Sequence, residues 1–194
     1  EGTWFIGDSM TCILVTDYLK PNNLIGDASY TGKYGAQITA FFGDVIMDET
    51  TATGICAYRP EHYGMEYDEV AVALGEQATA IYLMMGTNHT DGVTKQLYVD
   101  VVGHILECCP KATVYLQKIP FSNSSKVDPD AANARIRYAY DYYVNQGETR
   151  VRLIDTQTAI DYHLTTDGIH LTVMGQQKWY EALLSYAEEN EIPQ

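Results

Sequence analysis

The sequence lacks the signatures of several broad classes of protein. No apolar run approaches the roughly 18–20 residues that a membrane-spanning helix needs, so we expect no membrane span. Basic residues are scarce: 12 Lys and Arg stand against 26 Asp and Glu, which gives a net charge of −14. Nucleic acids and anionic membranes attract proteins mainly through basic patches. This charge balance therefore excludes nucleic acid as the expected partner and favours an uncharged or cationic substrate.

Two motifs are also missing, one typical of dinucleotide binding and one typical of serine hydrolases. The pattern Gly-x-Gly-x-x-Gly does not occur, so a dinucleotide-binding fold lacks its signature. The serine elbow Gly-x-Ser-x-Gly of the α/β-hydrolases is absent as well, because Gly7-Asp8-Ser9 continues with Met10-Thr11. If Ser9 is a nucleophile, it belongs to another kind of serine hydrolase.

Cysteine is sparse and is not arranged in a metal-binding pattern. The four cysteines are Cys12, Cys56, Cys108 and Cys109, and no two have the Cys-x-x-Cys spacing of zinc or thioredoxin-like sites. Adjacent Cys108 and Cys109 cannot easily bond to each other without strain. Two interpretations stay open: buried free thiols that behave as small apolar side chains, or a disulfide that involves Cys12 or Cys56.

The length of 194 residues fits one domain covering residues 1–194. The chain begins at Glu1 without Met and opens directly on a strand-like run, so we expect a processed or trimmed domain.

Five strand-like runs alternate with helix-like ones. We expect strands at 3–6, 28–34, 78–85, 112–116 and 151–154, and helices at 10–20, 96–108, 129–144 and 173–189. This alternation predicts a parallel sheet covered by helices on both faces. The stretch Phe41–Gly75, rich in Tyr and acidic residues, is expected to form a helix and loops beside the active site.

Three polar segments lie where the predicted strands or helices meet loops. Gly7-Asp8-Ser9 follows the first strand, Gly86-Thr87-Asn88 follows the third, and Asp167-Gly168-Ile169-His170 precedes the last helix. In open parallel sheets, ligands bind beyond the carboxyl ends of the strands. We therefore expect these segments to converge on one edge of the sheet.

Each segment has a chemical and a plain structural interpretation. Ser9, at a strand-to-helix junction, presents its hydroxyl near the free N–H groups of a helix start, but it could simply cap that helix. The spacing of Asp167 and His170 lets the carboxylate hold the ring Nδ1 and leaves Nε2 as a base. The alternative is a turn aspartate beside a surface histidine. Asn88 can donate from its amide to an oxyanion, or it can stabilise its own turn.

Taken in order, these motifs resemble those of the SGNH hydrolases, also called the GDSL esterase/lipase family. The resemblance implies a three-layer α/β/α, flavodoxin-like fold with a five-stranded parallel sheet. It implies that Ser9 is the nucleophile, His170 the general base and Asp167 its orienting carboxylate. The implied oxyanion hole is the Ser9 N–H, the Gly35 N–H and the Asn88 amide, although Gly32 and Gly43 compete with Gly35 for this assignment. No metal or organic cofactor is implied.

The function that follows is a serine esterase that hydrolyses short-chain acyl esters through an acyl-Ser9 intermediate. The expected substrates are small esters or acylated carbohydrates, most of all O-acetyl esters, because so short a chain has little room for a lid or deep tunnel. A lipase, lysophospholipase or thioesterase is an alternative, as is a non-catalytic carbohydrate-binding module that kept the fold. The tyrosines of Tyr58–Tyr67 could line a sugar groove or simply pack. By resemblance, we expect an extracytoplasmic or secreted protein.

Overall fold

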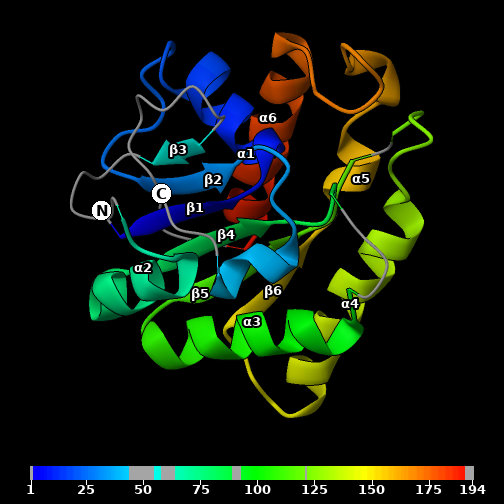
Figure 1. Cartoon of the computed structure of the whole chain (residues 1–194). Coiled ribbons are helices and arrows are strands. Elements are labelled where there is room, and N and C mark those ends of the chain that lie inside the picture. The colour runs from blue at the N-terminus through cyan, green and yellow to red at the C-terminus, as the bar shows by residue number, and fades with distance from the viewer. Residues whose placement is uncertain (1, 44–54, 58–63, 89–92, 121, 191–194) are drawn as a thin grey trace.

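A single mixed sheet lies at the centre of the computed structural model, which describes residues 2–43, 55–57, 64–88, 93–120 and 122–190 (Figure 1). The strand order is β3-β2-β1-β4-β5-β6. The strands are Thr3–Gly7 (β1), Ser29–Lys33 (β2), Ile55–Ala57 (β3), Ala80–Met84 (β4), Thr113–Gln117 (β5) and Val151–Ile154 (β6). All except β3 run parallel to their neighbours. The predicted five-stranded parallel sheet is therefore confirmed, in the strand order typical of flavodoxin-like folds. The sequence did not predict β3, which pairs antiparallel with β2 at the sheet edge.

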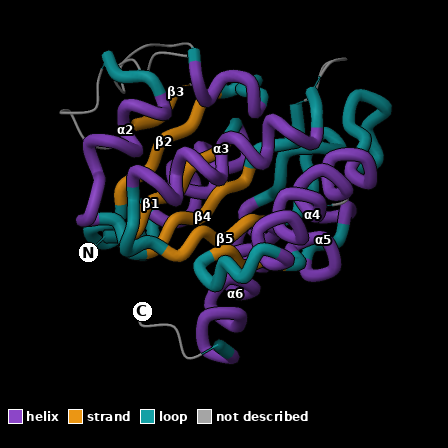
Figure 2. The backbone as a smooth tube through the Cα atoms, turned by 90° about the horizontal axis from the view of Figure 1, so that it is seen from below, coloured by secondary structure: helices purple, strands orange, loops and turns teal. Residues whose placement is uncertain are grey.

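Helices cover both faces of this sheet, as the alternation predicted. The α-helices are Ser9–Ile13 (α1), Tyr67–Leu74 (α2), Lys95–Cys108 (α3), Pro129–Asn145 (α4), Thr156–Ala159 (α5) and Val173–Glu189 (α6). Short helices of other geometry, labelled η, are Leu14–Leu19 (η1), Ile38–Phe42 (η2), Gly75–Gln77 (η4) and Tyr162–Leu164 (η5). One layer contains α1, η1 and α6, and the other contains α2, α3 and α4. Figure 2 views the molecule from the side of the second layer. Within the described ranges, no helix combines the length and the apolar character that a membrane crossing requires.

Two buried tryptophans make hydrogen bonds through their indole N–H groups, one within the sheet and one between α6 and the sheet. Trp4 of β1 donates to Thr31 Oγ1 on the neighbouring strand at 2.9 Å. Trp179 of α6 donates to Gln117 Oε1 at the end of β5 at 2.7 Å. Because a buried indole N–H is costly without a partner, these bonds fix how the strands and α6 sit together.

The helices α4 and α6 begin at the residues that the sequence predicted, and a capping side chain precedes each. Asp128 accepts the Ala131 N–H at 2.9 Å at the start of α4, and Thr172 accepts the Gly175 N–H at 3.2 Å at the start of α6. The helix predicted over 10–20 is instead divided. It is α-helical only through α1, and η1 continues with wider turns, in which the Lys20 N–H bonds to the Val15 carbonyl five residues back.

Among the cysteines whose side chains are described, one forms a disulfide and two are free, so each of the two interpretations holds for part of this set. Cys12 is disulfide-bonded. Cys108 and Cys109 carry free thiols. Cys109 is buried, and its burial raises the pKa of the thiol to about 11, as expected for an unreactive core cysteine.

Candidate active site

The register of the sheet brings the ends of its central strands to one edge. Gly7 of β1 is aligned with Gly32 of β2 and with Met84 of β4. Gly7 has no room for a side chain: a Cβ there would lie 2.1 Å from Thr11 Oγ1 and 2.3 Å from the Met84 carbonyl oxygen. This close approach lets α1 begin directly above the sheet edge. Ser9, its first residue, is consequently held at that edge.

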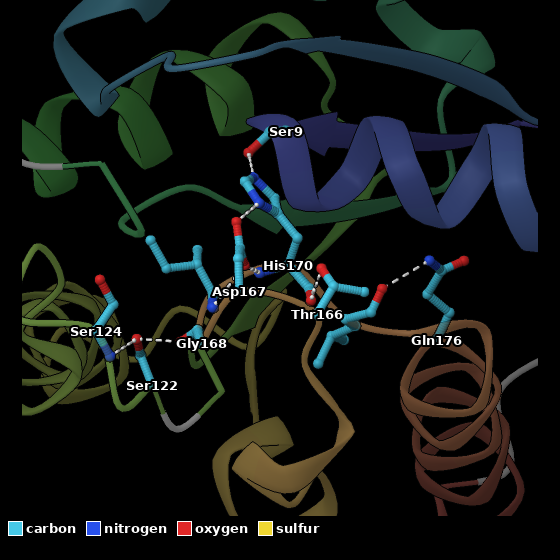
Figure 3. Close-up of polar contacts among 10 residues, drawn as sticks. Ser9, Ser122, Ser124, Thr166, Asp167, Gly168, His170 and Gln176 are labelled. Atoms are coloured by element: carbon cyan, nitrogen blue, oxygen red, sulfur yellow. Dashed lines mark hydrogen bonds and ion pairs between the residues drawn. The ribbon is translucent and has the colours of Figure 1, made fainter.

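The three residues predicted as a triad lie within hydrogen-bond distance of one another (Figure 3). Ser9 Oγ is 3.1 Å from His170 Nε2, and His170 Nδ1 is 2.7 Å from Asp167 Oδ2. The second carboxylate oxygen, Asp167 Oδ1, accepts the N–H groups of Ile169 at 3.0 Å and of His170 at 2.7 Å. A continuous polar line therefore joins a buried hydroxyl to an exposed carboxylate through His170, which is 161 residues from Ser9 in the sequence.

Hydrogen bonding keeps the Asp167 carboxyl ionised. Partial burial acts to raise its pKa, but the hydrogen bonds from His170 and from the Ile169 N–H outweigh this and lower the pKa to about 2. An ionised Asp167 accepts a hydrogen bond from the His170 Nδ1–H, which assigns the proton of the neutral ring to Nδ1. The Nε2 lone pair is then free to accept the proton of Ser9.

The proposed oxyanion donors come from the segments that follow β1, β2 and β4. Asn88 Nδ2 donates to the Ala36 carbonyl at 3.2 Å, which places Asn88 against the turn after β2. Gly35 lies in that turn, and its N–H donates to no residue that the structure describes. An amide nitrogen carries two hydrogens, so Asn88 retains a second donor. Gly32 lies inside β2 and Gly43 follows η2, whereas Gly35 directly precedes Ala36, whose carbonyl accepts from Asn88.

Tyr34 is a member of the site that the sequence did not reveal. Its ring is stacked on that of His170, with centroids 6.5 Å apart and planes inclined by 23°. The side chain is 47% exposed. Burial and the nearby Asp17 charge raise the pKa of Tyr34, so it remains a neutral phenol at neutral pH. A cavity of about 300 Å³ lies beside it, lined by Lys33, Tyr34, Gly35, Ala36, Gln37, Thr39, Ala40 and Gly43.

Asp8 is a second unpredicted feature, directly before Ser9. It is fully buried and caps α1 by accepting the Met10 N–H at 2.9 Å. Burial raises the pKa of this carboxyl to about 6, and nearby donors from Met10, Thr87 and Gly86 only partly offset the effect. Asp8 Oδ2 and Thr87 Oγ1 reach hydrogen-bond geometry with no described residue. The carboxyl thus lies beneath the loop that presents Asn88.

The tyrosine-rich stretch contributes packing where it is described. Tyr67 is buried, and its hydroxyl donates to the Gly7 carbonyl at 3.3 Å, so it supports the site from below instead of lining a groove. Tyr58 and Tyr63 lie outside the described residues. Across the described ranges, no three His, Cys, Asp or Glu side chains gather as a metal site would require.

Comparisons by sequence match no family model and no curated protein. Comparisons of structure find several likenesses. A family two carbohydrate esterase from Clostridium thermocellum, solved with cellohexaose, has a TM-score of 0.66 at 15% identity, covering 97% of this chain and 63% of that one. A family 3 carbohydrate esterase from Talaromyces cellulolyticus has a TM-score of 0.62 at 15% identity, covering 96% of each chain. A protein described as a GDSL-like lipase from Parabacteroides merdae has a TM-score of 0.59 at 12% identity, covering 98% and 95%. At these identities the likeness concerns the fold.

Proposed function

Because the chain has the fold of the SGNH hydrolases, we propose that it is a serine ester hydrolase that removes short acyl groups, above all acetyl groups, from carbohydrate. The proposal rests on one observation. Ser9 Oγ, the His170 ring and the Asp167 carboxylate form an unbroken line with separations of 3.1 and 2.7 Å. In a serine hydrolase these are the positions of the nucleophile, the general base and the carboxylate that orients it.

The first half of the reaction transfers the acyl group to Ser9. His170 Nε2 takes the hydroxyl proton while Ser9 Oγ attacks the ester carbonyl carbon. The resulting oxyanion is stabilised by the N–H groups of Ser9 and Gly35 and by the Asn88 amide, and such donors contribute about 3–4 kcal/mol each. The tetrahedral intermediate then collapses. The bond to the alcohol breaks, and His170 returns its proton to the departing oxygen.

The second half regenerates the free serine. A water molecule gives its proton to His170 Nε2 and attacks the acyl carbon. A second oxyanion forms at the same donors, and its collapse breaks the bond to Ser9 Oγ, which recovers the proton from His170. The products are the carboxylic acid and the free enzyme. Asp167 stays ionised throughout and stabilises the imidazolium formed in each half.

Polar surroundings favour a short acyl group and a sugar as the alcohol. The cavity beside Tyr34 includes Lys33, Gln37 and Thr39 in its wall, which suits hydroxyl-bearing ligands better than an alkyl chain. The half-exposed Tyr34 ring offers an aromatic face next to His170. Two of the similar structures are themselves described as carbohydrate esterases.

The alternatives differ in what they would need. A lipase, lysophospholipase or thioesterase would need an apolar channel for its acyl chain, and the described cavity wall is largely polar. A carbohydrate-binding module without activity would have no use for an ionised Asp167 aligned through His170 with Ser9.

We also propose an extracytoplasmic location. It is supported by the disulfide at Cys12, since disulfides persist mainly in oxidising compartments.

Hydrolysis of p-nitrophenyl acetate by three proteins tests the proposal. The wild type should hydrolyse the ester, and Ser9→Ala should lose at least about 10³-fold in kcat/KM. Ser185→Ala is the control, because Ser185 is exposed on α6 and its hydroxyl donates to Glu189, away from the site. It should match the wild type. Equal rates for wild type and Ser9→Ala would overturn the proposed mechanism.

A second assay tests the substrate class. Acetate release from acetylated xylan should exceed the hydrolysis of long-chain p-nitrophenyl esters at equal enzyme concentration. Preference for the long-chain esters would favour the lipase alternative instead.

A further inference from the structure

Asp167, the acidic member of the triad, lies on an exposed loop between η5 and α6. The Asp167 side chain is 51% exposed. The base of this loop is closed by its own segment, because the His170 carbonyl accepts the Thr166 N–H at 2.8 Å and the Thr166 hydroxyl at 3.1 Å. Gln176 of α6 adds a bond to the Leu171 carbonyl at 3.1 Å (Figure 3). These contacts hold the base of the loop, whereas Asp167 is near its tip.

A serine from a different part of the chain contacts the tip. Ser122, in the segment after β5, donates its hydroxyl to the Gly168 carbonyl at 2.6 Å, across 46 residues of sequence. Its Oγ also accepts the Ser124 N–H at 3.1 Å, as Figure 3 shows. A hydroxyl has one hydrogen to give. With the N–H of Ser124 as donor on one side and the Gly168 carbonyl as acceptor on the other, its direction is fixed.

The contact between the two loops is close. Gly168 is buried although Asp167 before it is exposed. Its φ of +86° is one that residues with a Cβ rarely adopt, and a Cβ at this position would lie 2.1 Å from Asn123 Oδ1. The Asn123 side chain therefore lies directly against Gly168, and the Ser124 nitrogen would lie 3.4 Å from such a Cβ.

One peptide group connects Ser122 to the carboxylate of Asp167. The Gly168 carbonyl, which accepts from Ser122, and the Ile169 N–H belong to the same planar peptide unit. That N–H donates to Asp167 Oδ1 at 3.0 Å, and Asp167 Oδ2 holds His170 Nδ1 at 2.7 Å. Fixing the carbonyl end of the plane thus fixes the N–H end. Hydrogen bonds in such a line also polarise and strengthen one another.

We propose that Ser122 is a positioning residue for the triad. Its hydroxyl orients the Gly168–Ile169 peptide, the peptide orients the Asp167 carboxylate, and the carboxylate orients His170 toward Ser9. This inference rests on the proposed function, because it assigns Ser122 a role in the same reaction. Ser122 acts at the far side of Asp167, so it affects the chemical steps and leaves ester binding unchanged.

Steady-state kinetics on p-nitrophenyl acetate with Ser122→Ala, Ser122→Thr and Ser125→Ala test this role. Ser122→Ala should lower kcat by about 10–100-fold, the effect of a displaced catalytic group, with little change in KM. Ser122→Thr keeps the hydroxyl and should recover most of the lost kcat. Ser125→Ala is the matched control, since Ser125 is exposed in the same segment, and it should behave as the wild type.

A spectroscopic measurement separates positioning from a purely structural role. The Nδ1 proton shared between His170 and Asp167 should give a low-field proton NMR resonance in the wild type. In Ser122→Ala this resonance should shift or broaden, whereas in Ser122→Thr it should be restored. A variant that melts at a lower temperature but keeps both the resonance and kcat would show a structural role only, and the inference would fail.

The two proposals fail in different ways. If Ser9→Ala abolishes hydrolysis while Ser122→Ala keeps the wild-type kcat and resonance, the esterase stands and the positioning role is overturned. If the wild type shows no Ser9-dependent hydrolysis, the proposed function is overturned. The resonance in Ser122→Ala then decides alone whether Ser122 orients the pair of Asp167 and His170.

Discussion

The buried carboxyl group of Asp8, beside the candidate nucleophile Ser9, makes the stability of the folded protein depend on pH. Burial raises the pKa of Asp8 from its ordinary value of 3.8 to about 6. The folded protein therefore binds a proton at Asp8 more tightly than the unfolded chain does. The stabilisation from this proton is complete below about pH 4 and is lost as the pH rises through 6.

The variant Asp8→Asn tests this linkage because an amide does not titrate. The unfolding free energy of the wild type, minus that of Asp8→Asn, should decrease by roughly 2–3 kcal/mol between pH 4 and pH 7.5. Urea unfolding at several pH values measures it. Asp141→Asn, at a surface ion pair with Arg137, is the control and should show no such decrease. A constant difference for Asp8→Asn would mean that Asp8 titrates like an exposed carboxyl.

At the residue scale, the sequence reveals some members of the site and hides others. Ser9, Asp167 and His170 could be predicted because they stand in short motifs at the ends of recognisable elements. Tyr34 and Ser122 could not, because each acts through a contact with a loop that is distant in sequence. No local pattern of residues marks such a contact before the chain is folded.

At the scale of elements, the packing of two loops can be tested through Gly168. Gly168→Ala introduces a Cβ at a φ of +86°, 2.1 Å from Asn123 Oδ1, so the Asn123 side chain must shift and the strained Gly168 backbone must readjust against the loop 122–124. Backbone strain at such a φ costs about 1–3 kcal/mol. We expect a modest loss of stability together with at least about a tenfold loss of kcat, because readjustment at Gly168 displaces the peptide that accepts from Ser122.

Gly147→Ala is the matched control for this experiment. Gly147 has a φ of +82°, nearly the same backbone conformation, but nothing lies within 4 Å of the position of an added Cβ. The control variant should lose a similar amount of stability, measured by thermal unfolding, and keep its kcat. An equal loss of kcat in both variants would show that stability alone explains the effect and would contradict the role of the loop contact.

The elements themselves were largely predictable, for physical reasons. Asp128 and Thr172 mark helix starts because a side-chain oxygen satisfies the free N–H groups there. Buried parallel strands such as β4 are visible as short apolar runs. The change from α1 to the wider η1 was not predictable, since hydrophobic spacing does not distinguish bonds four residues back from bonds five back. The three-residue β3 is too short to give a pattern.

At the scale of the whole molecule, the net charge and the wall of the cavity are compatible with the proposed uncharged ligand. The net charge of −14 disfavours polyanionic partners, and the cavity beside Tyr34 has a largely polar wall. The order of the parallel strands brings the ends of β1, β2 and β4 together, which no single segment of sequence specifies. The alternation of strands and helices, together with the polar segments at the strand ends, predicted this arrangement.

Covalent labelling by a serine-reactive organophosphonate tests the central claim most directly. If Ser9 is the nucleophile activated by His170, mass spectrometry should find one label per chain, on the peptide that contains Ser9. Ser9→Ala should take up no label, while the Ser185→Ala control should be labelled like the wild type. Labelling of another side chain, or equal labelling of Ser9→Ala and the wild type, would contradict the assignment of Ser9 as the nucleophile.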